Sequence, residues 1–418
     1  MKILFAHQNF PGQYLPLARH LGAKGGHEVV FITQRKDADL PGVRKVVYEP
    51  KRKITAGVHH YLRETEASVL NGQEVARVAM MLRDSGFTPD VMLGHNGWGE
   101  IWYLKEIFPR SPLIGYFEFF YRFDGADVGF EPGIPVDFDT GPRVRTKNVG
   151  NLLGLDTSDL GQCPTHWQRS VYPACYQTKL HIVHEGVETN TVVPNPRARL
   201  RVPDTELELG AGDEVVTYVA RNLEPYRGFP SFMRSLPTIL ERRPRAHVLI
   251  VGGDGVSYGA ALPDGKTYKQ ELLNELGSSL DLSRVHFLGK VPYSFFLGIL
   301  QVSRVHVYLT YPFVLSWSML EAMSAACLIV ASRTPPVQEV IRDGENGILV
   351  DLFSPAEIAE RVVEALADPG AHQQLRANAR RTAVEQYDQQ TICLPAQLRL
   401  MRHAAPPPQA SIWGARRA

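Results

Sequence analysis

The chain has 418 residues, of which 44% are hydrophobic and 21% charged, a composition typical of a folded globular protein with two domains of ordinary size. Its 45 Lys and Arg against 44 Asp and Glu leave a net charge of +1, so no global field attracts nucleic acid, and any anion must be bound by local groups. The four cysteines lack CxxC or metal-ligand spacing, and no apolar stretch reaches the roughly 20 residues of a membrane span, which together favour a reduced, cytoplasmic protein.

The first half of the chain alternates short apolar runs with segments of helical periodicity, which predicts a parallel sheet with helices packed on it. Strands are expected at KILFA, HEVVFIT, VRKVVY, DVMLGH, PLIGYFE, DLGQCPT and KLHIVHEGV, with helices over about 12–24 and 58–84. An N-terminal domain is therefore expected over residues 1–190. Residues 189–213 are proline-rich and charged without periodicity, so they are predicted to be the interdomain linker.

A second alternating series, from EVVTYVA to LIVAS, predicts a second doubly wound domain over residues 205–385. Within it, Ser354, Pro355 and Glu357 have the pattern of a capping box with proline at the first helical position. Residues 404–418 have no periodicity and are predicted to be a mobile tail. Open parallel sheets bind ligands beyond the carboxyl ends of their strands, so a cleft between the two domains is the expected binding site.

Two arginines follow the first strand of the second domain, in EVVTYVARNLEPYRGF. Arg221 lies just beyond the apolar run and Arg227 precedes Gly228. A guanidinium is always charged and presents a fork of donors that suits the oxygens of a diphosphate. Both arginines are therefore predicted to stabilise a diphosphate leaving group. Two solvated loop arginines are the alternative that this pair alone leaves open.

A predicted helix start follows the strand RVHVYLT. The chain enters this helix near Ser316, so the N–H groups of Ser316, Trp317 and Ser318 are expected to be free to bind phosphate. Glu321 lies one turn inside the helix, where its carboxylate could accept hydrogen bonds from the paired hydroxyls of a ribose. A glutamate favoured there only by the helix dipole is the competing interpretation.

In order and spacing, these segments resemble the retaining family-4 glycosyltransferases of GT-B architecture. The resemblance covers nearly the whole second domain, through YVARNLEPYRGF, LIVGGDG, VHFLGKV and LEAMSAACLIVASRTPPVQEVIRDGENGILVD. It covers the first domain more loosely, through FPGQ, GHEVVFIT, PDVMLGHNGWGE and HEGVET. It implies two Rossmann-like domains, each a doubly wound parallel sheet of α/β class, that face one another across a cleft. It also implies a final helix, over about 386–403, that crosses back to the first domain.

The resemblance implies roles for particular residues. Arg221 and Arg227 would neutralise the donor phosphates and act in catalysis, while Glu321 would hold the ribose. Gly12, at the first strand-to-helix turn, would let the backbone approach the donor phosphate; without the resemblance, a glycine at this place is more often an ordinary turn residue. His95 matches a position that faces the transferred sugar and is predicted to be catalytic, with a hydrogen-bonded loop histidine as the alternative.

This chain departs from the family pattern at three positions. Phe313 stands where the family usually carries a glutamate that contacts the sugar, and Val314 and Leu315 follow in place of a Gly-Phe-Gly-like loop. Arg227 stands where lysine is usual, which keeps the charge but changes the geometry. Glu118 stands where a histidine or a small polar residue is expected, so the acceptor side is predicted to be rebuilt. Glu118, Phe313, Val314 and Leu315 are expected to face the acceptor or the sugar.

The resemblance implies a metal-independent sugar transfer with retention of configuration. The donor would be a nucleotide-diphosphate sugar, with UDP or GDP as the nucleotide, and no cofactor would be needed. The DFD triplet at 137–139 could be read as a metal-binding motif of the other glycosyltransferase architecture, but it lies in a loop rich in Pro and Gly. A sugar-nucleotide epimerase and a sugar-nucleotide-binding protein without activity are the alternative functions.

The acceptor is left open as a small molecule, a saccharide or a lipid-linked compound. YFEFFYRF, at 116–123, could stack on a flat acceptor, although aromatic residues at a strand end are more often core. KRK at 51–53, with Arg44 and Lys45, could contact the inner face of a membrane that carries a lipid-linked acceptor. A solvated surface is the favoured interpretation of these basic residues.

Overall fold

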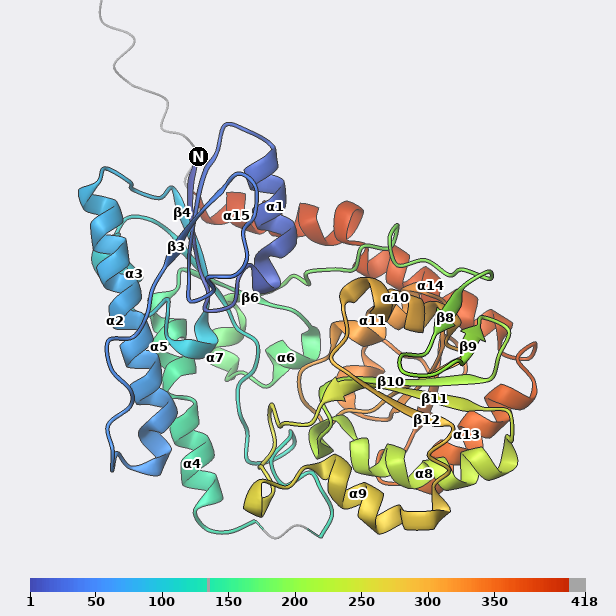
Figure 1. Ribbon diagram of the computed structural model, residues 1–418. Coiled ribbons are helices and arrows are strands. Elements are labelled where there is room, and N and C mark those ends of the chain that lie inside the picture. The colour runs from blue at the N-terminus through green and yellow to red at the C-terminus, as the bar shows by residue number, and fades with distance from the viewer. Residues whose placement is uncertain (134–135, 406–418) are drawn as a thin grey trace, which may run out of the picture. The chain divides into compact units, whose positions relative to one another are not determined.

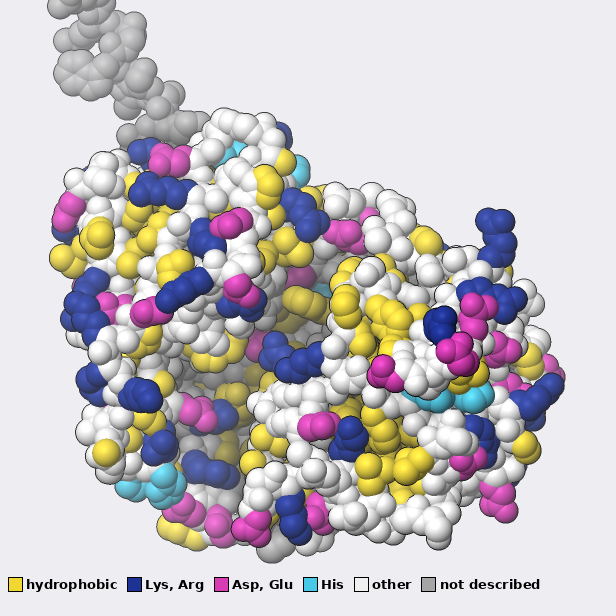
Figure 2. Space-filling model, in the orientation of Figure 1, with side chains coloured by type: hydrophobic (Ala, Val, Ile, Leu, Met, Phe, Trp, Pro, Cys, Tyr) yellow, Lys and Arg dark blue, Asp and Glu magenta, His cyan; other side chains and the backbone are white. Residues whose placement is uncertain are grey.

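The computed structural model describes residues 1–133 and 136–405, and in it the chain forms two compact units (Figure 1). The first unit comprises Met1–Glu185 and the chain from Gln390, and the second comprises Gly186–Gln389. The sequence predicts these boundaries near residues 190, 205 and 386. Of the predicted tail, residues 406–418 lie outside the described part of the chain. Lys and Arg side chains are interspersed with Asp and Glu over the visible face of both units (Figure 2).

The first unit is built on a parallel sheet of seven strands in the order β3-β2-β1-β4-β5-β6-β7. Its strands are β1 (Lys2–Ala6), β2 (Glu28–Thr33), β3 (Val43–Val47), β4 (Val91–His95), β5 (Leu113–Tyr116), β6 (Leu160–Cys163) and β7 (Leu180–Ile182). Its helices are α1 (Leu15–Ala23), α2 (Arg63–Asp84), α3 (Leu104–Ile107), α4 (Thr140–Lys147), α5 (Val149–Thr157), α6 (His166–Ser170), α7 (Ala174–Gln177) and α15 (Leu394–Ala404). The order reverses direction at β1, as in a doubly wound fold.

Side chains of β1 alternate between two hydrophobic cores, because successive residues of a strand point to opposite faces of the sheet. Ile3 and Phe5 pack with residues of α1 and α15, whereas Leu4 and Ala6 pack with residues of α2. Helices therefore cover both faces of the sheet (Figure 1). This double burial explains why the strand reads as the continuous apolar run KILFA.

The second unit contains a parallel sheet of six strands in the order β12-β11-β10-β13-β14-β15. Its strands are β10 (Val215–Asn222), β11 (His247–Gly253), β12 (Val285–Gly289), β13 (Val305–Tyr308), β14 (Leu328–Ser332) and β15 (Ile348–Val350). Its helices are α8 (Phe229–Arg242), α9 (Tyr268–Leu276), α10 (Tyr293–Val302), α11 (Trp317–Ser324), α12 (Pro335–Gln338), α13 (Pro355–Ala367) and α14 (Gln373–Tyr387). The predicted pair of doubly wound α/β domains is confirmed.

The predicted linker at 189–213 is wrong, because this stretch is part of the second unit. It contains β8 (Arg199–Arg201) and β9 (Glu208–Gly210), which pair antiparallel. Leu200 and Leu209 of this hairpin are buried against Leu249 of β11. The alternation of apolar and charged residues in RLRV and ELEL is short and lies among prolines. A prediction based on composition therefore assigned these strands to a linker.

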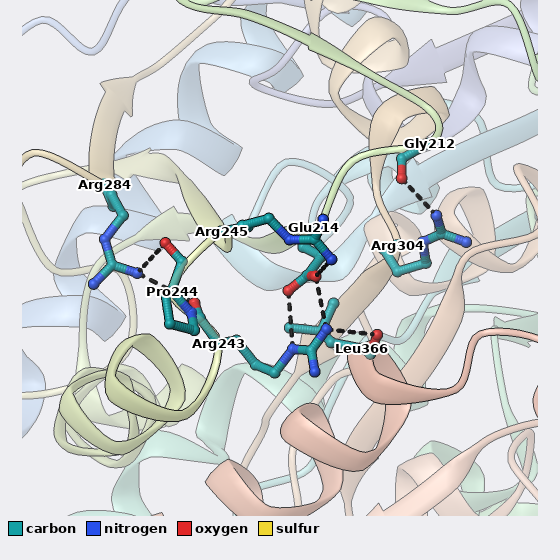
Figure 3. A network of polar contacts seen from close by, with 8 residues as sticks. All are labelled: Gly212, Glu214, Arg243, Pro244, Arg245, Arg284, Arg304 and Leu366. Atoms are coloured by element: carbon teal, nitrogen blue, oxygen red, sulfur yellow. Dashed lines mark hydrogen bonds and ion pairs between the residues drawn. The ribbon is translucent and has the colours of Figure 1, made fainter.

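A network of charged residues lies at the amino-terminal ends of the strands in the second sheet (Figure 3). Glu214 accepts two hydrogen bonds from Arg243, at 2.9 and 2.6 Å, and one from Arg245 at 3.2 Å. Arg284 donates to the backbone carbonyls of Arg243 and Pro244, just beyond the end of α8, at 3.2 and 3.3 Å. A cation at a helix carboxyl terminus satisfies carbonyl groups that the helix leaves free. These arginines therefore have a structural role. They lie at the amino-terminal ends of the strands, whereas ligands bind parallel sheets beyond the carboxyl ends.

Candidate functional site

A tight turn after β10 places Arg227 inside the second unit. Pro225–Arg227 form one 3-10 turn, and Gly228 follows in the left-handed region at φ 64°. A Cβ atom at this glycine would lie 2.4 Å from the Cβ of Leu309, so only glycine fits the turn. The Arg227 side chain is consequently drawn inward and the residue is 7% exposed.

Arg227 is a buried cation held by neutral groups. Its Nη1 atom donates to Thr310 Oγ1 and to the carbonyl of Val314, each at 2.8 Å, and lies 3.4 Å from the Tyr308 hydroxyl. Burial by itself lowers the pKa of Arg227. The neighbouring tyrosines, led by Tyr308, raise this pKa, and the net shift is upward. No Asp or Glu of the described chain forms an ion pair with this guanidinium. A buried charge without a partner is costly, so this position favours an anionic ligand.

Arg221 is exposed at the carboxyl end of β10 and makes no hydrogen bond or ion pair with the residues that the structure describes. Arg221 and Arg227 therefore flank the same strand end, one exposed and one buried. Parallel sheets bind ligands beyond such ends. Arg221 is free to turn toward an anion there, because none of the described residues forms a polar contact with its guanidinium.

The start of α11 differs from the prediction in one respect. The N–H of Ser316 is not free, because it donates to the Tyr308 hydroxyl at 2.7 Å. That hydroxyl also lies next to Arg227, so Tyr308 links the helix start to the guanidinium. The hydroxyls of Ser316 and Ser318 are 3.0 Å apart, and Trp317 is exposed at the first helical position. An anion here would meet hydroxyl groups as well as the helix N-terminus.

Glu321 lies one turn into α11 and is oriented by α10. Its Oε1 atom accepts a hydrogen bond of 2.8 Å from the Tyr293 hydroxyl, and its Oε2 atom has no partner in residues 1–133 and 136–405. Burial raises the pKa of Glu321, and the bond from Tyr293 only partly offsets that rise. The second oxygen is thus available to accept a hydrogen bond from a ligand hydroxyl.

The loop before α11 presents little side-chain surface. Phe313, Val314 and Leu315 are all buried, and Leu315 belongs to the same hydrophobic core as Met319. The Val314 carbonyl is already taken by Arg227. The expectation that these three side chains face the sugar is therefore wrong for the side chains, since each packs into the protein.

A buried carboxylate that the sequence analysis did not single out organises the neighbouring loop. Glu224 is fully buried and accepts backbone N–H groups of Ser257 at 2.9 Å, Tyr258 at 3.1 Å and Gly259 at 2.8 Å. This contact fixes the loop after β11 so that the Tyr258 ring lies 5.3 Å from the Arg227 guanidinium carbon. The acidic residue in EPYRG was visible in the sequence, but its role follows only from burial.

In the first unit, two predicted residues, Gly12 and His95, lie against His7. Gly12 adopts φ 54°, and a Cβ there would lie 2.7 Å from the His7 ring. β1 and β4 pair in parallel with Ala6 opposite Gly94, so the next residues, His7 and His95, stack with their ring centroids 4.8 Å apart. His7 was not predicted, although its place at the end of the first strand was a signal.

The hydrogen bonds of the two histidines define their protonation. His7 accepts the Asn9 N–H at Nδ1, and its Nε2 lies 2.7 Å from the Gln13 side-chain carbonyl, so Nε2 carries the proton. Burial lowers the pKa of His7 to about 4. His95 accepts the Gly97 N–H at Nδ1 (2.9 Å), and burial, followed by His7, lowers its pKa. Both rings are therefore neutral near pH 7.

His95 and Glu118 form a polar pair at the ends of β4 and β5. The proton on His95 Nε2 has no hydrogen-bond partner in the described chain, and Nε2 lies 3.8 Å from Glu118 Oε2. The Glu118 side chain is 31% exposed, whereas His95 is buried. The pair thus offers one N–H donor and one carboxylate, which suits a ligand that carries hydroxyl groups.

The other sequence features are spread over the first unit. Tyr116, Phe117 and Phe119 of YFEFFYRF are buried, which agrees with the core interpretation. Residues 51–53 are exposed. Within the described ranges, no group of three or more His, Cys, Asp or Glu side chains is placed to hold a metal ion. None of the helices described is long and apolar enough to cross a membrane.

Two family matches cover most of the chain. Residues 25–192 match the Glycosyl transferase family 4 group and residues 205–382 match the Glycosyl transferases group 1. The D-inositol 3-phosphate glycosyltransferase of Corynebacterium efficiens is 27% identical over 321 residues, 75% of this chain and 72% of that protein. The corresponding enzyme of Rhodococcus jostii is also 27% identical, but the match spans only 43% of its length.

A further relative and a solved structure extend these similarities. The GDP-mannose-dependent alpha-(1-6)-phosphatidylinositol monomannoside mannosyltransferase of Mycolicibacterium smegmatis is 24% identical, over 77% of this chain and 81% of its own. The structure of HepE from Anabaena with UDP and glucose has a TM-score of 0.67 at 16% identity, covering 96% of this chain and 99% of that one. At this identity the likeness concerns the fold.

Proposed function

Since the chain belongs to the glycosyl transferases group 1 and is a nucleotide-sugar-dependent glycosyltransferase of GT-B architecture, we propose that it transfers a hexosyl group with retention of configuration and without a metal ion. The acceptor nucleophile is a hydroxyl group. In this reaction the bond from the sugar C1 to the diphosphate oxygen breaks, and the acceptor oxygen bonds to C1 on the same face. The acceptor proton passes to the departing phosphate.

The observation that carries this proposal is that Arg227 is buried and forms no ion pair with an Asp or Glu of the residues that the structure describes. Preorganised donors stabilise charge best in a site with few mobile waters, because no reorganisation is needed as the charge develops. We assign Arg227 to the diphosphate of the donor, with Arg221 as the exposed second cation. The start of α11, at Ser316 and Trp317, adds a helix N-terminus to the same phosphate site.

Glu321 is assigned to the ribose of the donor. Tyr293 holds one of its oxygens, so the other has a defined direction and can accept from a hydroxyl. In the first unit, we assign the neutral His95 to the transferred sugar and Glu118 to the acceptor. Gly12 has no side chain, so we expect its backbone to approach the donor phosphate. These assignments need no carboxylate as a nucleophile, because the acceptor oxygen bonds directly to C1, and none as a general base, because the leaving phosphate receives the acceptor proton.

The names of the relatives suggest where to begin with substrates. Inositol 3-phosphate and phosphatidylinositol mannoside are the first acceptors to test, and GDP sugars are the first donors, with UDP sugars added because the HepE structure contains UDP. A lipid-linked acceptor would bring the protein to a cytoplasmic membrane face, and the exposed basic residues at 51–53 would be the first contact to mutate.

A binding and transfer screen tests the proposal. Purified protein is mixed with UDP- and GDP-sugars, and melting temperature and nucleotide release are measured; a ligand at 100 times its Kd stabilises the fold by about 2.7 kcal/mol. Arg227→Ala should lose the stabilisation, whereas Arg245→Ala, at the opposite edge of the sheet and highly exposed, should keep it. Donor cleavage without transfer to any acceptor, or equal loss in both variants, would overturn the proposal.

A further inference from the structure

Five aromatic rings of the second unit form one cluster beside Arg227. We call it the aromatic cluster, and it consists of Tyr226, Tyr258, Tyr311, Phe313 and Phe353. Ring centroids are 4.8 Å apart for Tyr258 and Phe313, 5.6 Å for Tyr226 and Phe313, and 4.9 Å for Tyr226 and Tyr311. Phe313 and Tyr311 are buried, whereas Tyr226, Tyr258 and Phe353 are half-buried. The two buried rings therefore support three rings that keep accessible surface.

Tyr258 is held in place from two sides. Glu224 accepts the backbone N–H of Tyr258 and of both its neighbours, while the ring packs on Phe313 at an interplanar angle of 58°. The Arg227 guanidinium carbon lies 5.3 Å from the centre of the same ring. A ring fixed in this way loses little conformational entropy when a ligand contacts it.

Among the residues that the structure describes, the carboxylate that bonds to the loop carrying Tyr258 is already occupied. Glu224 is the acidic residue that contacts this loop, and three N–H groups already occupy its two oxygens. Hydroxyl groups pressed against aromatic carbon without a partner cost free energy. The C–H face of a pyranose ring, by contrast, packs on an aromatic ring as other apolar surfaces do.

We infer that Tyr258, supported by Phe313 and Tyr226, is a specificity-determining residue that packs against the C–H face of the donor's pyranose. This inference rests on the proposed function, in which Arg227 binds the donor diphosphate. The sugar is joined to that diphosphate through a single oxygen atom, so it lies within reach of the half-buried rings around the guanidinium. Phe313 thus acts as the support of an aromatic platform in place of a hydrogen-bonding group.

Calorimetric titration of UDP, GDP and their glucose and mannose conjugates tests the inference with Tyr258→Leu and Tyr258→Phe. Tyr258→Leu should raise the Kd of the sugar nucleotide by about 10-fold, the scale of one aromatic contact, and leave that of the free nucleotide within about twofold. Tyr258→Phe keeps the ring and should bind both as the wild type does. Tyr268→Phe, which removes the hydroxyl that holds the Ala260 carbonyl at 2.9 Å, is the matched control for loop anchoring.

Saturation-transfer NMR on the wild-type protein supplies a measurement that needs no variant. Irradiation of aromatic protons should transfer magnetisation to the sugar C–H protons of the conjugate. Equal weakening of nucleotide and conjugate by Tyr258→Leu, unchanged binding of both, or absence of transfer to the sugar would overturn the inference while the proposed function stands. If the wild type binds no nucleotide and no conjugate, the proposed function falls, and the inference with it.

Discussion

Replacing Arg227 with alanine should separate catalysis from stability. Removing a preorganised donor to a developing anion typically lowers turnover by about 100- to 1,000-fold, and we expect a loss of at least this order. The same change removes the Nη1 atom, which donates hydrogen bonds of 2.8 Å to the Val314 carbonyl and to Thr310 Oγ1. A buried acceptor left without its donor costs about 1 to 3 kcal/mol, so the free energy of unfolding should fall by that order.

Two further variants divide the effect into charge and shape. Arg227→Lys keeps the charge but loses the fork of donors, so its loss of turnover should be milder than that of alanine. Arg227→Met fills much of the volume without the charge, so it should lose turnover like alanine while losing less stability to cavity formation. Turnover is measured by nucleotide release at saturating donor, well below the melting temperature, and stability by urea denaturation.

One outcome would refute the reasoning. If Arg227→Ala or Arg227→Met kept near-normal turnover, the guanidinium would be a structural cation and the phosphate assignment would be wrong. Arg245→Ala serves as the control, because this arginine is exposed and pairs with Glu214 at the opposite edge of the sheet. A comparable loss of turnover in that control would show that the assay reports folding and not the site.

Other residues allow further tests. Turnover should survive excess EDTA, since arginines and a helix N-terminus supply the charge; loss restored by magnesium or manganese would contradict this. Glu321→Ala should weaken donor binding by about 1.5 to 3 kcal/mol, the range for hydrogen bonds to a charged group, as measured by titration. Donor affinity should also fall as pH drops through the raised pKa of Glu321, because the protonated carboxyl is a poorer acceptor, and Glu321→Gln should remove this dependence. Phe313→Glu should not improve transfer, since the new carboxylate would be desolvated between Tyr258 and Tyr226; a gain in turnover would show that the loop has been misread.

The alternation of apolar runs and helical segments was sufficient to predict two doubly wound domains, and the two parallel sheets confirm it. The reason is that strands buried on both faces are apolar throughout, as in KILFA, so their signal is local. Gly228 was visible in YRGF, but its positive φ and its close contact with Leu309 were found only in the structure. The hairpin of β8 and β9 was missed because its three-residue strands carry too little periodicity.

What the sequence by itself determined was the fold, the family and the identity of the charged groups, because these follow from periodicity and from motifs read along the chain. Only the tertiary structure decided their environments. From the sequence, Arg227 could be an ordinary loop arginine. In the structure it is buried and bonded to Thr310 and Val314, which are more than 80 positions away in the chain. The free N–H predicted at Ser316 is also absent, because the loop folds back so that the hydroxyl of Tyr308, eight positions earlier at the end of β13, accepts it. Burial and hydrogen bonding depend on contacts between distant segments, and these exist only once the sheet has brought the ends of its strands together.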